Sequence, residues 1–283
     1  MQANPVCYFA CLVLSVVTIV ICDADAVRCQ SPQPGAKVIR DVVYSHAAAR
    51  GSATGFKDLG LDLYMPGAAP SGVRPVIVAL HGGGFTAGDK AGPEGMEEVC
   101  EGFAAKGYVC ASINYRLEAD DPPTDGATLR ERVVAAVVED AAKAVAWVRA
   151  NAKAYSFDPK RIVLLGRSSG AGAAMQLAYS NAGRKLGIRA VVEMSGALHG
   201  KLDSIQRGDA PLCIIHGTND TLVPVAEAQA LAARAKEVGL PYEIYLLEGR
   251  GNGHVKSFAR EVDGVSLLEH ADAFLRVHLA RPR

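Results

Sequence analysis

The sequence predicts an α/β protein with a mostly parallel central sheet and helices on both of its faces. Residues 76–80 and 162–165 are unbroken apolar runs, which are typical of strands buried on both faces. Such runs alternate along the chain with segments in which apolar residues keep helical spacing. No repeat, low-complexity tract or linker interrupts residues 27–283, so we expect one domain there.

The composition is that of a globular protein without a strongly charged partner. The 283 residues include 30 lysines and arginines and 30 aspartates and glutamates, and 49% of them are hydrophobic. A chain of near-zero net charge without a basic patch is not predicted to bind nucleic acid or an anionic membrane surface. No cysteine or histidine spacing fits a metal site, so we expect no metal. The sequence implies no organic cofactor either.

The N-terminal segment has the pattern of a secretory signal. Residues 6–22 are apolar, and Ala24, Asp25 and Ala26 fit a small-residue cleavage site. We therefore expect residues 1–26 to be a signal peptide and the mature protein to be secreted or periplasmic. No lysine or arginine precedes the apolar stretch, and its length is near the lower limit of a membrane span. An uncleaved anchor formed by residues 6–22 is the alternative.

Four of the seven cysteines lie beyond this segment, at Cys29, Cys100, Cys110 and Cys213. Cys110 and Cys213 stand inside strand-like runs, where a cysteine is typical of a small core residue. A secreted protein permits disulfides, but the sequence does not assign a pair. It also leaves the oligomeric state open.

The periodicity of apolar residues predicts the elements in order. Residues 61–66 alternate apolar and polar side chains, as a half-exposed strand does, and residues 131–152 keep helical spacing over the longest helix. Asp158 and Pro159 predict a turn into the strand at 162–165. The expected strands are 38–44, 61–66, 76–80, 109–116, 162–165, 189–194, 211–217 and 242–247. The expected helices are 95–106, 131–152, 171–178, 224–239 and 264–279.

A G-x-S-x-G motif with Ser168 at its centre lies between the strand at 162–165 and the helix at 171–178. A serine on a sharp strand-to-helix turn holds its hydroxyl clear of the backbone, and the helix N-terminus offers N–H groups to an oxyanion. Taken alone, the motif also fits an idle serine in a glycine-rich turn. Ser168 is favoured over Ser169 as a nucleophile because only Ser168 has glycines two positions before and after it.

A second glycine motif follows the strand at 76–80. Residues 81–84 are one histidine and three glycines, and consecutive glycines expose backbone N–H groups that no side chain covers. We expect the N–H groups of Gly83, Gly84 and Ser169 to form an oxyanion hole. A floppy loop is the alternative for this stretch taken alone.

Ser168, Asp220 and His254 form a candidate catalytic set, because each follows the carboxyl end of a predicted strand, where ligands bind in such sheets. A serine hydroxyl needs a base to take its proton, histidine suits that role near neutral pH, and a carboxylate fixes the histidine tautomer. The order serine, aspartate, histidine is the order found with a nucleophile elbow. Asp220 is favoured as the acid over Asp209 and Asp263.

Other histidines compete with His254 for the role of the base. His254 is favoured because it lies in a glycine-rich loop after the last strand. His216 is expected to be structural, because it precedes Gly217 in a strand exit, and His270 and His278 are expected to be solvated in the final helix. His199 follows the strand at 189–194 and is expected to line the site.

Several short motifs together resemble the α/β-hydrolase esterases of the HGGG type. That group includes hormone-sensitive-lipase-like esterases, small bacterial carboxylesterases and feruloyl esterases. The resemblance runs from about residue 61 to the C-terminus, and the GDK motif is more similar to the feruloyl-esterase branch. Arg167 and Ser169 depart from the pattern, since many relatives carry an acidic residue and an alanine there. The motifs are HGGGF at 81–85, GDK at 88–90, NYRL at 114–117, DPKRI at 158–162, the glycine-serine run at 166–172, HGTND at 216–220 and GH at 253–254.

The resemblance implies an α/β-hydrolase fold and a serine carboxylic-ester hydrolase that acts through an acyl-enzyme without a cofactor. Residues 195–209 leave little room for a lid, which implies an open site and small-molecule esters that are short-chain or soluble, including acetyl or feruloyl esters of carbohydrates. Phe85 and His199 are the expected substrate contacts. A serine peptidase on the same fold and a non-catalytic binding protein are the alternatives, and the intact catalytic set argues against the second. The identity of the acyl and alcohol parts stays open.

Overall fold

The computed structural model describes residues 36–67, 72–120, 129–252 and 257–280. Ten strands and seven α-helices lie within these ranges. The strands are β1 Lys37–Ala48, β2 Phe56–Met65, β3 Arg74–Leu80, β4 Val109–Ile113, β5 Phe157–Arg167, β6 Ala190–Met194, β7 Leu212–Gly217, β8 Tyr242–Leu247, β9 Glu261–Val262 and β10 Val265–Ser266. The helices are α1 Glu97–Ala105, α2 Leu129–Ala150, α3 Ala152–Tyr155, α4 Ser169–Ala178, α5 Asn181–Leu186, α6 Val225–Val238 and α7 Leu267–Ala280.

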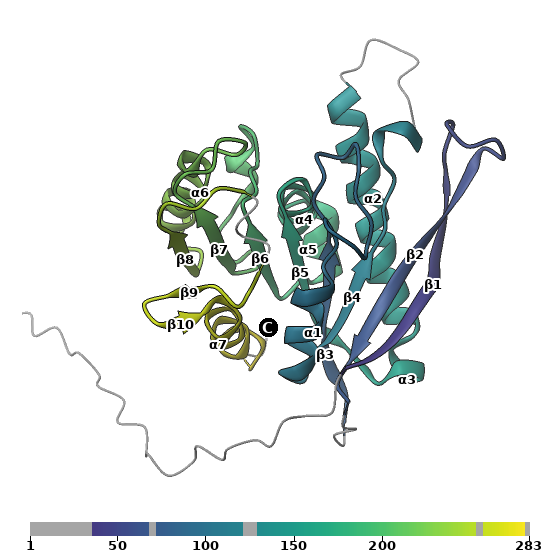
Figure 1. The fold of residues 1–283 in the computed structure, drawn as a ribbon, viewed down its shortest axis with the longest axis horizontal. Coiled ribbons are helices and arrows are strands. Elements are labelled where there is room, and N and C mark those ends of the chain that lie inside the picture. The colour runs from purple at the N-terminus through teal and green to yellow at the C-terminus, as the bar shows by residue number, and fades with distance from the viewer. Residues whose placement is uncertain (1–35, 68–71, 121–128, 253–256, 281–283) are drawn as a thin grey trace, which may run out of the picture. The chain divides into compact units, whose positions relative to one another are not determined.

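Eight of the strands form one sheet in the order β1-β2-β4-β3-β5-β6-β7-β8 (Figure 1). β1 pairs antiparallel with β2, and β2 pairs antiparallel with β4. From β4 to β8 every pairing is parallel, so the predicted mostly parallel sheet is confirmed. β9 and β10 form a separate two-stranded hairpin.

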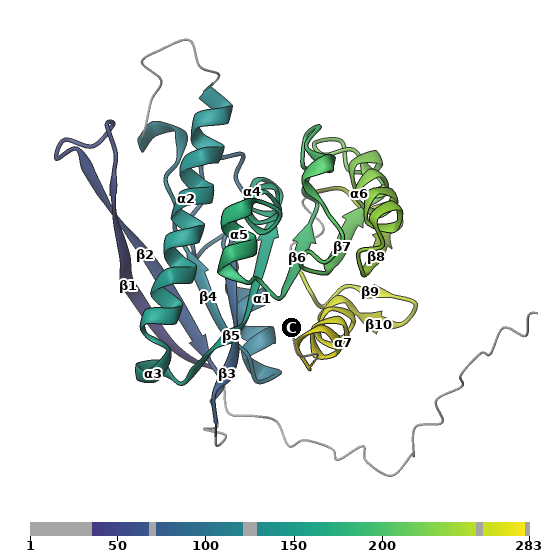
Figure 2. The ribbon, with the colours of Figure 1, turned by 180° about the vertical axis from the view of Figure 1, so that it is seen from behind.

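Helices cover both faces of this sheet, which explains the unbroken apolar runs in its central strands. Val76 and Val78 pack into a core cluster with side chains of α2, α4 and α6. Ile77 and Ala79 point the other way, into a cluster with side chains of α1 and α7. Figure 2 shows α2, α4 and α5 in front of the sheet and α1 behind it. Because alternate residues serve the two faces, every position from Val76 to Leu80 needs an apolar side chain.

Every predicted strand and helix is present in the structure, and the ends of most of them differ by a few residues. β8 has the predicted bounds, whereas β5 begins at Phe157. The expected turn at Asp158 and Pro159 is therefore wrong, because these residues continue the strand. α3, α5 and the β9–β10 hairpin were not predicted, since elements of two to six residues leave no periodic signal. Residues 195–211 contain one short 3-10 turn, Leu202–Ser204, which agrees with the expected minimal lid.

A disulfide joins Cys100 of α1 to Cys110 of β4. The interpretation of Cys110 as a simple core residue is therefore incomplete, because it is both buried and bonded. Cys213 is a free, buried cysteine, as predicted. The sequence could not predict this pairing, because Cys100 and Cys110 come together only when α1 packs on the sheet.

The predictions for the N-terminus concern residues that the structure does not describe. The signal or anchor at residues 1–26 and Cys29 lie outside the described ranges. Within those ranges, no helix combines the length and the apolar character that a bilayer crossing needs.

Candidate active site

Ser168 occupies a strained turn between β5 and α4. Its φ is 51° and its ψ is −118°, a backbone conformation that a residue with a side chain rarely adopts. The turn is held by the N–H of Ser168, which donates to the carbonyl of Met194 at 2.7 Å, and by its carbonyl, which accepts from Gly172 at 3.1 Å. The serine thus stands at the N-cap of α4 without capping the helix through its side chain.

The two glycines of the motif, Gly166 and Gly170, are required because other backbone segments lie too close for a β-carbon at either position. A β-carbon at Gly166 would lie 2.5 Å from the backbone of residues 170 and 171. A β-carbon at Gly170 would lie 2.3 Å from the carbonyl oxygen of His81. These contacts bring the first turn of α4 against the end of β3, where the second glycine motif begins.

The loop after β3 offers free backbone donors beside this turn. Gly83, Gly84 and Phe85 all have positive φ, at 110°, 64° and 68°. In the described part of the chain, no hydrogen bond engages the N–H groups of Gly83 and Gly84. Ser169 is the first residue of α4, where a backbone N–H has no acceptor within the helix. Both glycines, Ser168 and Ser169 line one cavity of about 430 Å³.

Loops at the carboxyl ends of five strands line this cavity together with the helices α2 and α4. Besides the serine turn, Phe85 follows β3, His199 follows β6, Leu222 follows β7 and Asn252 follows β8. The expected contacts Phe85 and His199 therefore both line the cavity. Its volume suits a small ligand.

His81 supports the start of the glycine loop. Its ring stacks on Tyr115 with the ring centroids 4.1 Å apart, and its Nδ1–H donates to the Gly82 carbonyl at 2.7 Å. Burial lowers the pKa of His81 to about 4, so the imidazole is neutral near pH 7. The Tyr115 hydroxyl donates to the His81 carbonyl at 2.7 Å and holds the start of the loop.

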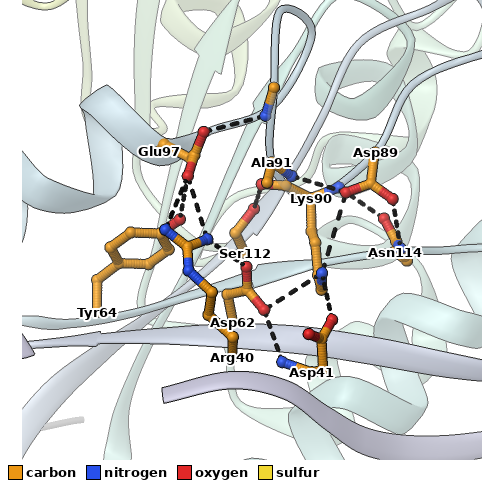
Figure 3. Close-up of polar contacts among 11 residues, drawn as sticks. Arg40, Asp41, Asp62, Tyr64, Asp89, Lys90, Ala91, Glu97, Ser112 and Asn114 are labelled. Atoms are coloured by element: carbon orange, nitrogen blue, oxygen red, sulfur yellow. Dashed lines mark hydrogen bonds and ion pairs between the residues drawn. The ribbon is translucent and has the colours of Figure 1, made fainter. Parts of the chain in front are cut away.

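Lys90 anchors the far end of the same loop (Figure 3). Its ammonium contacts Asp41 at 2.8 Å and the fully buried Asp62 at 3.3 Å. Its backbone N–H donates to Asn114 Oδ1 at 2.6 Å, and its carbonyl accepts from Ser112 at 2.6 Å. Burial opposes the charge, but the contacts with Asp41 and Asp62 outweigh it and raise the pKa of Lys90. The loop is thereby tied to β1, β2 and β4.

Further ion pairs extend this network toward α1, as Figure 3 shows. Arg40 contacts Asp62 at 3.1 Å and Glu97 at 3.2 Å. Glu97 in turn accepts from the N–H of Gly92 at 3.0 Å. The residues between Lys90 and α1 are thus fixed by charged side chains. The sequence motif at 88–90 indicated this loop, but nothing in the sequence indicated that Asp62 is its buried partner.

Arg167, the departure from the esterase pattern, is 3% exposed and pairs with Glu94. Its Nη2 also donates to the Glu94 carbonyl at 2.8 Å. The positive charge next to Ser168 is therefore compensated. Glu94 lines the cavity as well, so this neutral pair forms part of its wall.

Asp220 lies in the loop after β7 with its carboxylate fully buried. Oδ1 accepts from the N–H groups of Leu222 and Val223, both at 2.9 Å. Oδ2 accepts from the side-chain amide of Asn252 at 3.0 Å. The loop after β8 is therefore bonded to Asp220 two residues before position 254. His254 itself lies outside the described residues.

The rival histidines have partners of their own, although Nε2 of His216 also lies 3.6 Å from Oδ2 of Asp220, the candidate acid. His216 is buried, and its Nε2–H donates to the Val223 carbonyl at 2.8 Å, which agrees with the structural role expected for it. The expectation that His270 and His278 are solvated is wrong. His278 is 9% exposed because it packs against Phe274, and His270 is half-buried with Nε2 on the Val262 carbonyl.

The rival carboxylates lie elsewhere. Asp209 accepts two hydrogen bonds from Arg184, at 2.7 and 2.8 Å, and lines a different pocket. Asp263 stands in the turn between β9 and β10. Neither lines the cavity that contains Ser168.

Glu193 is a buried titratable group whose position the sequence did not indicate. It lies on β6 with no exposed surface, and its Oε2 accepts from the N–H of Gly196 at 2.7 Å. Its Oε1 has no hydrogen-bond partner among the described residues. Burial raises the pKa of Glu193 to about 8; the Gly196 contact opposes this rise and the nearby charge of Asp220 adds to it. A lone acidic residue inside an apolar strand run was the available signal.

Comparison with known proteins supports an esterase relationship. Residues 61–197 match the BD-FAE family model. Esterase 2 of Thermogutta terrifontis superposes with a TM-score of 0.68 at 26% identity, over 91% of this chain and 100% of that one. A phenmedipham hydrolase of Pseudarthrobacter oxydans is 35% identical over 48% of this chain and 26% of its own length. A probable carboxylic ester hydrolase of Mycobacterium tuberculosis, LipM, is 23% identical over 62% and 48%. The chain thus spans between a quarter and a half of the length of these two curated relatives.

Proposed function

Because this chain resembles the α/β-hydrolase-type esterases in sequence and in fold, we propose that it is a serine carboxylesterase that cleaves short-chain or soluble esters through an acyl-enzyme. One observation carries the proposal: Ser168 sits in a strained strand-to-helix turn, on the same cavity as the free N–H groups of Gly83 and Gly84. A serine in such a turn beside unpaired donors is the arrangement that acyl transfer needs.

In the proposed first step, the Ser168 Oγ attacks the ester carbonyl carbon while its proton passes to His254. Asp220 accepts a hydrogen bond from the other ring nitrogen and stabilises the imidazolium. The N–H groups of Gly83, Gly84 and Ser169 hold the negative charge that develops on the carbonyl oxygen. The ester C–O bond then breaks, the alcohol leaves with the proton from His254, and the acyl group stays on Ser168.

In the second step, His254 takes a proton from water, and the hydroxide attacks the acyl carbonyl. The bond to Ser168 breaks, the serine regains its proton from His254, and the carboxylic acid leaves. The assignment of His254 is supported by the hydrogen bond from Asn252 to Asp220, which brings the loop after β8 to the proposed acid.

Short acyl groups are proposed because the cavity is small and partly apolar. Phe85, Val134 and Leu222 contribute apolar walls within its 430 Å³. The related Thermogutta esterase 2 has been solved with propionate and with butyrate bound, which supports the same substrate class here. Acetyl esters of carbohydrates are candidates among the short-chain esters and feruloyl esters among the soluble ones, and a series of model esters would rank them.

We further propose that the protein is exported. The apolar stretch at residues 6–22 and the following small residues support a signal peptide. The Cys100–Cys110 disulfide supports an oxidising compartment. The mass of the exported protein would test this, since cleavage after residue 26 removes the first 26 residues and an anchor leaves them in place.

The catalytic proposal predicts the effect of Ser168→Ala on hydrolysis of p-nitrophenyl butyrate. We expect kcat to fall by at least about 10⁴-fold, because the nucleophile is lost while the cavity stays intact. Ser169→Ala is the matched control, since it keeps the backbone N–H that the oxyanion needs, and its kcat should stay within about tenfold.

Labelling by a fluorophosphonate provides a second measurement. Wild type and Ser169→Ala should react, and Ser168→Ala should not. Full activity in Ser168→Ala would refute the assignment of the nucleophile, and a wild type that neither hydrolyses esters nor reacts with the probe would favour a binding protein on this scaffold.

A further inference from the structure

The mouth of the cavity carries a cation that the proposed mechanism does not use. Arg130, in the first turn of α2, is exposed and lines the cavity that contains Ser168. Its Nη2 donates to Nε2 of His199 at 3.2 Å. Among the described residues, this ring is the one hydrogen-bond partner of Arg130, and no carboxylate forms an ion pair with it.

The described carboxylates near Arg130 do not neutralise its positive charge. Glu94 is the one carboxylate among the described residues that line this cavity, and it already pairs with the buried Arg167. Glu131 follows Arg130 in the helix but is not part of the lining, and successive helix residues do not face each other. Lys201 adds a second cation at the rim, where its Nζ donates to Gln176 of the lining at 3.0 Å. Counted over the described residues, the charges at the mouth of the cavity are therefore net positive.

The chemistry of Arg130 suits an anionic group. A guanidinium has five N–H donors in a plane and binds a carboxylate through two parallel hydrogen bonds. One donor is engaged by His199, which fixes the plane of the guanidinium, and the others remain for a ligand. The apolar side chains of Phe85 and Val134 line the same cavity as Arg130 and Ser168.

We propose that the ester cleaved at this site carries a carboxylate a few bonds away from the scissile carbonyl, and that Arg130 binds this carboxylate. His199 is the positioning residue that orients the guanidinium. The inference rests on the proposed esterase function and names its substrate class: anionic half-esters, or esters of alcohols and phenols that bear an acid.

Two matched substrate pairs test the proposal and distinguish the two sources of the charge. Ethyl hydrogen glutarate and ethyl pentanoate differ by a carboxylate on the acid side. 4-Acetoxybenzoate and its methyl ester differ by a carboxylate on the alcohol side. For each pair, kcat/KM of the charged ester divided by that of the neutral ester is measured in wild type, Arg130→Gln and Arg130→Glu.

In at least one pair, Arg130→Gln should lower this ratio about three- to tenfold, as expected for a partly exposed charge-assisted contact. Arg130→Glu should lower it further. Arg207→Gln is the matched control, because Arg207 is an exposed arginine that lines a different pocket, and it should leave the ratio unchanged. In wild type, raising the ionic strength to about 0.5 M should lower the ratio, because salt screens the attraction.

The role of His199 has its own signature. His199→Ala should raise KM for the charged ester while its kcat changes little, because the guanidinium loses its orientation and not its charge. If Arg130→Gln leaves both ratios unchanged while wild type hydrolyses the neutral esters, this inference is refuted and the proposed function stands. If wild type hydrolyses none of the four esters, the proposed function fails and the inference fails with it.

Discussion

At the scale of single residues, Glu193 is a carboxyl group held neutral beside the proposed site. It has no exposed surface, and its pKa is raised to about 8 because the charged form would be buried with few partners. Its strand, β6, pairs with β5 and also supplies the Met194 carbonyl that holds the Ser168 turn. A negative charge on Glu193 would therefore lie on the strand next to β5, one residue before the carbonyl that holds the Ser168 turn.

This burial predicts a pH dependence of stability. The unfolded chain releases the Glu193 proton near pH 4.3, whereas the folded chain keeps it until about pH 8. Folding is thus favoured by this group below about pH 4.3, and the contribution is lost as the pH rises from there to about 8. We expect Glu193→Gln, which is neutral throughout, to gain stability relative to wild type across this window.

Urea unfolding of wild type and Glu193→Gln between pH 5 and pH 8.5 measures this difference directly. The free energies of unfolding should lie within about 1 kcal/mol of each other at pH 5 and diverge in favour of the variant toward pH 8.5. A difference that stays constant with pH would show that Glu193 does not titrate in this range. Subtracting the two curves removes the contributions of other groups.

At the scale of elements, the loop between β3 and α1 is held at its two ends by different forces. Its start is fixed by the stacking of His81 on Tyr115 and by the Tyr115 hydroxyl. Its end is fixed by the ion pairs of Lys90 with Asp41 and Asp62. The N–H groups of Gly83 and Gly84 lie between these anchors, so their direction depends on both.

Replacing Lys90 by methionine should loosen this loop without changing any group that touches the substrate. Asp62 keeps Arg40 and the N–H of Asp41 as partners but loses one cation, so we expect a loss of about 1–3 kcal/mol in the free energy of unfolding. Because the oxyanion donors lose their fixed direction, kcat for p-nitrophenyl butyrate should fall about tenfold while KM changes less.

Two variants control this prediction. Lys90→Arg keeps the charge and should recover part of kcat. Lys143→Met removes an exposed ion pair with Glu139 on α2 and should cost less than about 1 kcal/mol, with kcat unchanged. Equal kcat in Lys90→Met and wild type would show that the glycine loop does not need this anchor.

At the scale of the whole molecule, the Cys100–Cys110 disulfide stabilises the native chain by restricting the unfolded one. It closes a short loop between α1 and β4, on the face of the sheet that α1 and α7 cover. A loop of about ten residues is expected to contribute about 2–3 kcal/mol. The effect belongs to the whole chain, because the unfolded ensemble loses conformations when the bond is present.

The double variant Cys100→Ala/Cys110→Ala should therefore unfold about 2–3 kcal/mol more easily than wild type in a urea titration. Dithiothreitol should lower the stability of wild type toward that of the variant and leave the variant unchanged. If the reductant alters both proteins equally, the bond does not contribute in this way.

Much of the fold could be predicted because its strands and helices carry strong periodic signals. The sequence predicts β3 and β5 from their apolar runs, because helices cover both faces of these strands. It predicts α2 from a long amphipathic pattern, because one side of this helix packs on the sheet. The start of β5 was not, because pairing of Phe157 with Arg74 on β3 extends the strand through Asp158 and Pro159. Here the neighbouring strand outweighed local turn preference.

In the candidate site, too, some residues could be predicted from the sequence and others could not. Ser168, Gly83 and Gly84 were found from glycine spacing, since close backbone approach excludes other residues and so leaves a mark in the sequence. Lys90 with Asp62, Glu193 and Arg130 were not, because their roles come from partners that are distant in the chain. A lysine in a loop and a lysine in a buried ion pair look the same until the partner is known.

The sequence by itself determined which segments become strands and helices and which serine stands between them, because those properties depend on neighbours a few residues away. The tertiary structure alone decided that Cys100 bonds Cys110, that Asp62 neutralises Lys90, that Glu193 is held neutral and that Arg130 faces the cavity of Ser168. These depend on burial and on distances between remote residues, and burial sets the strength of every charge that they involve.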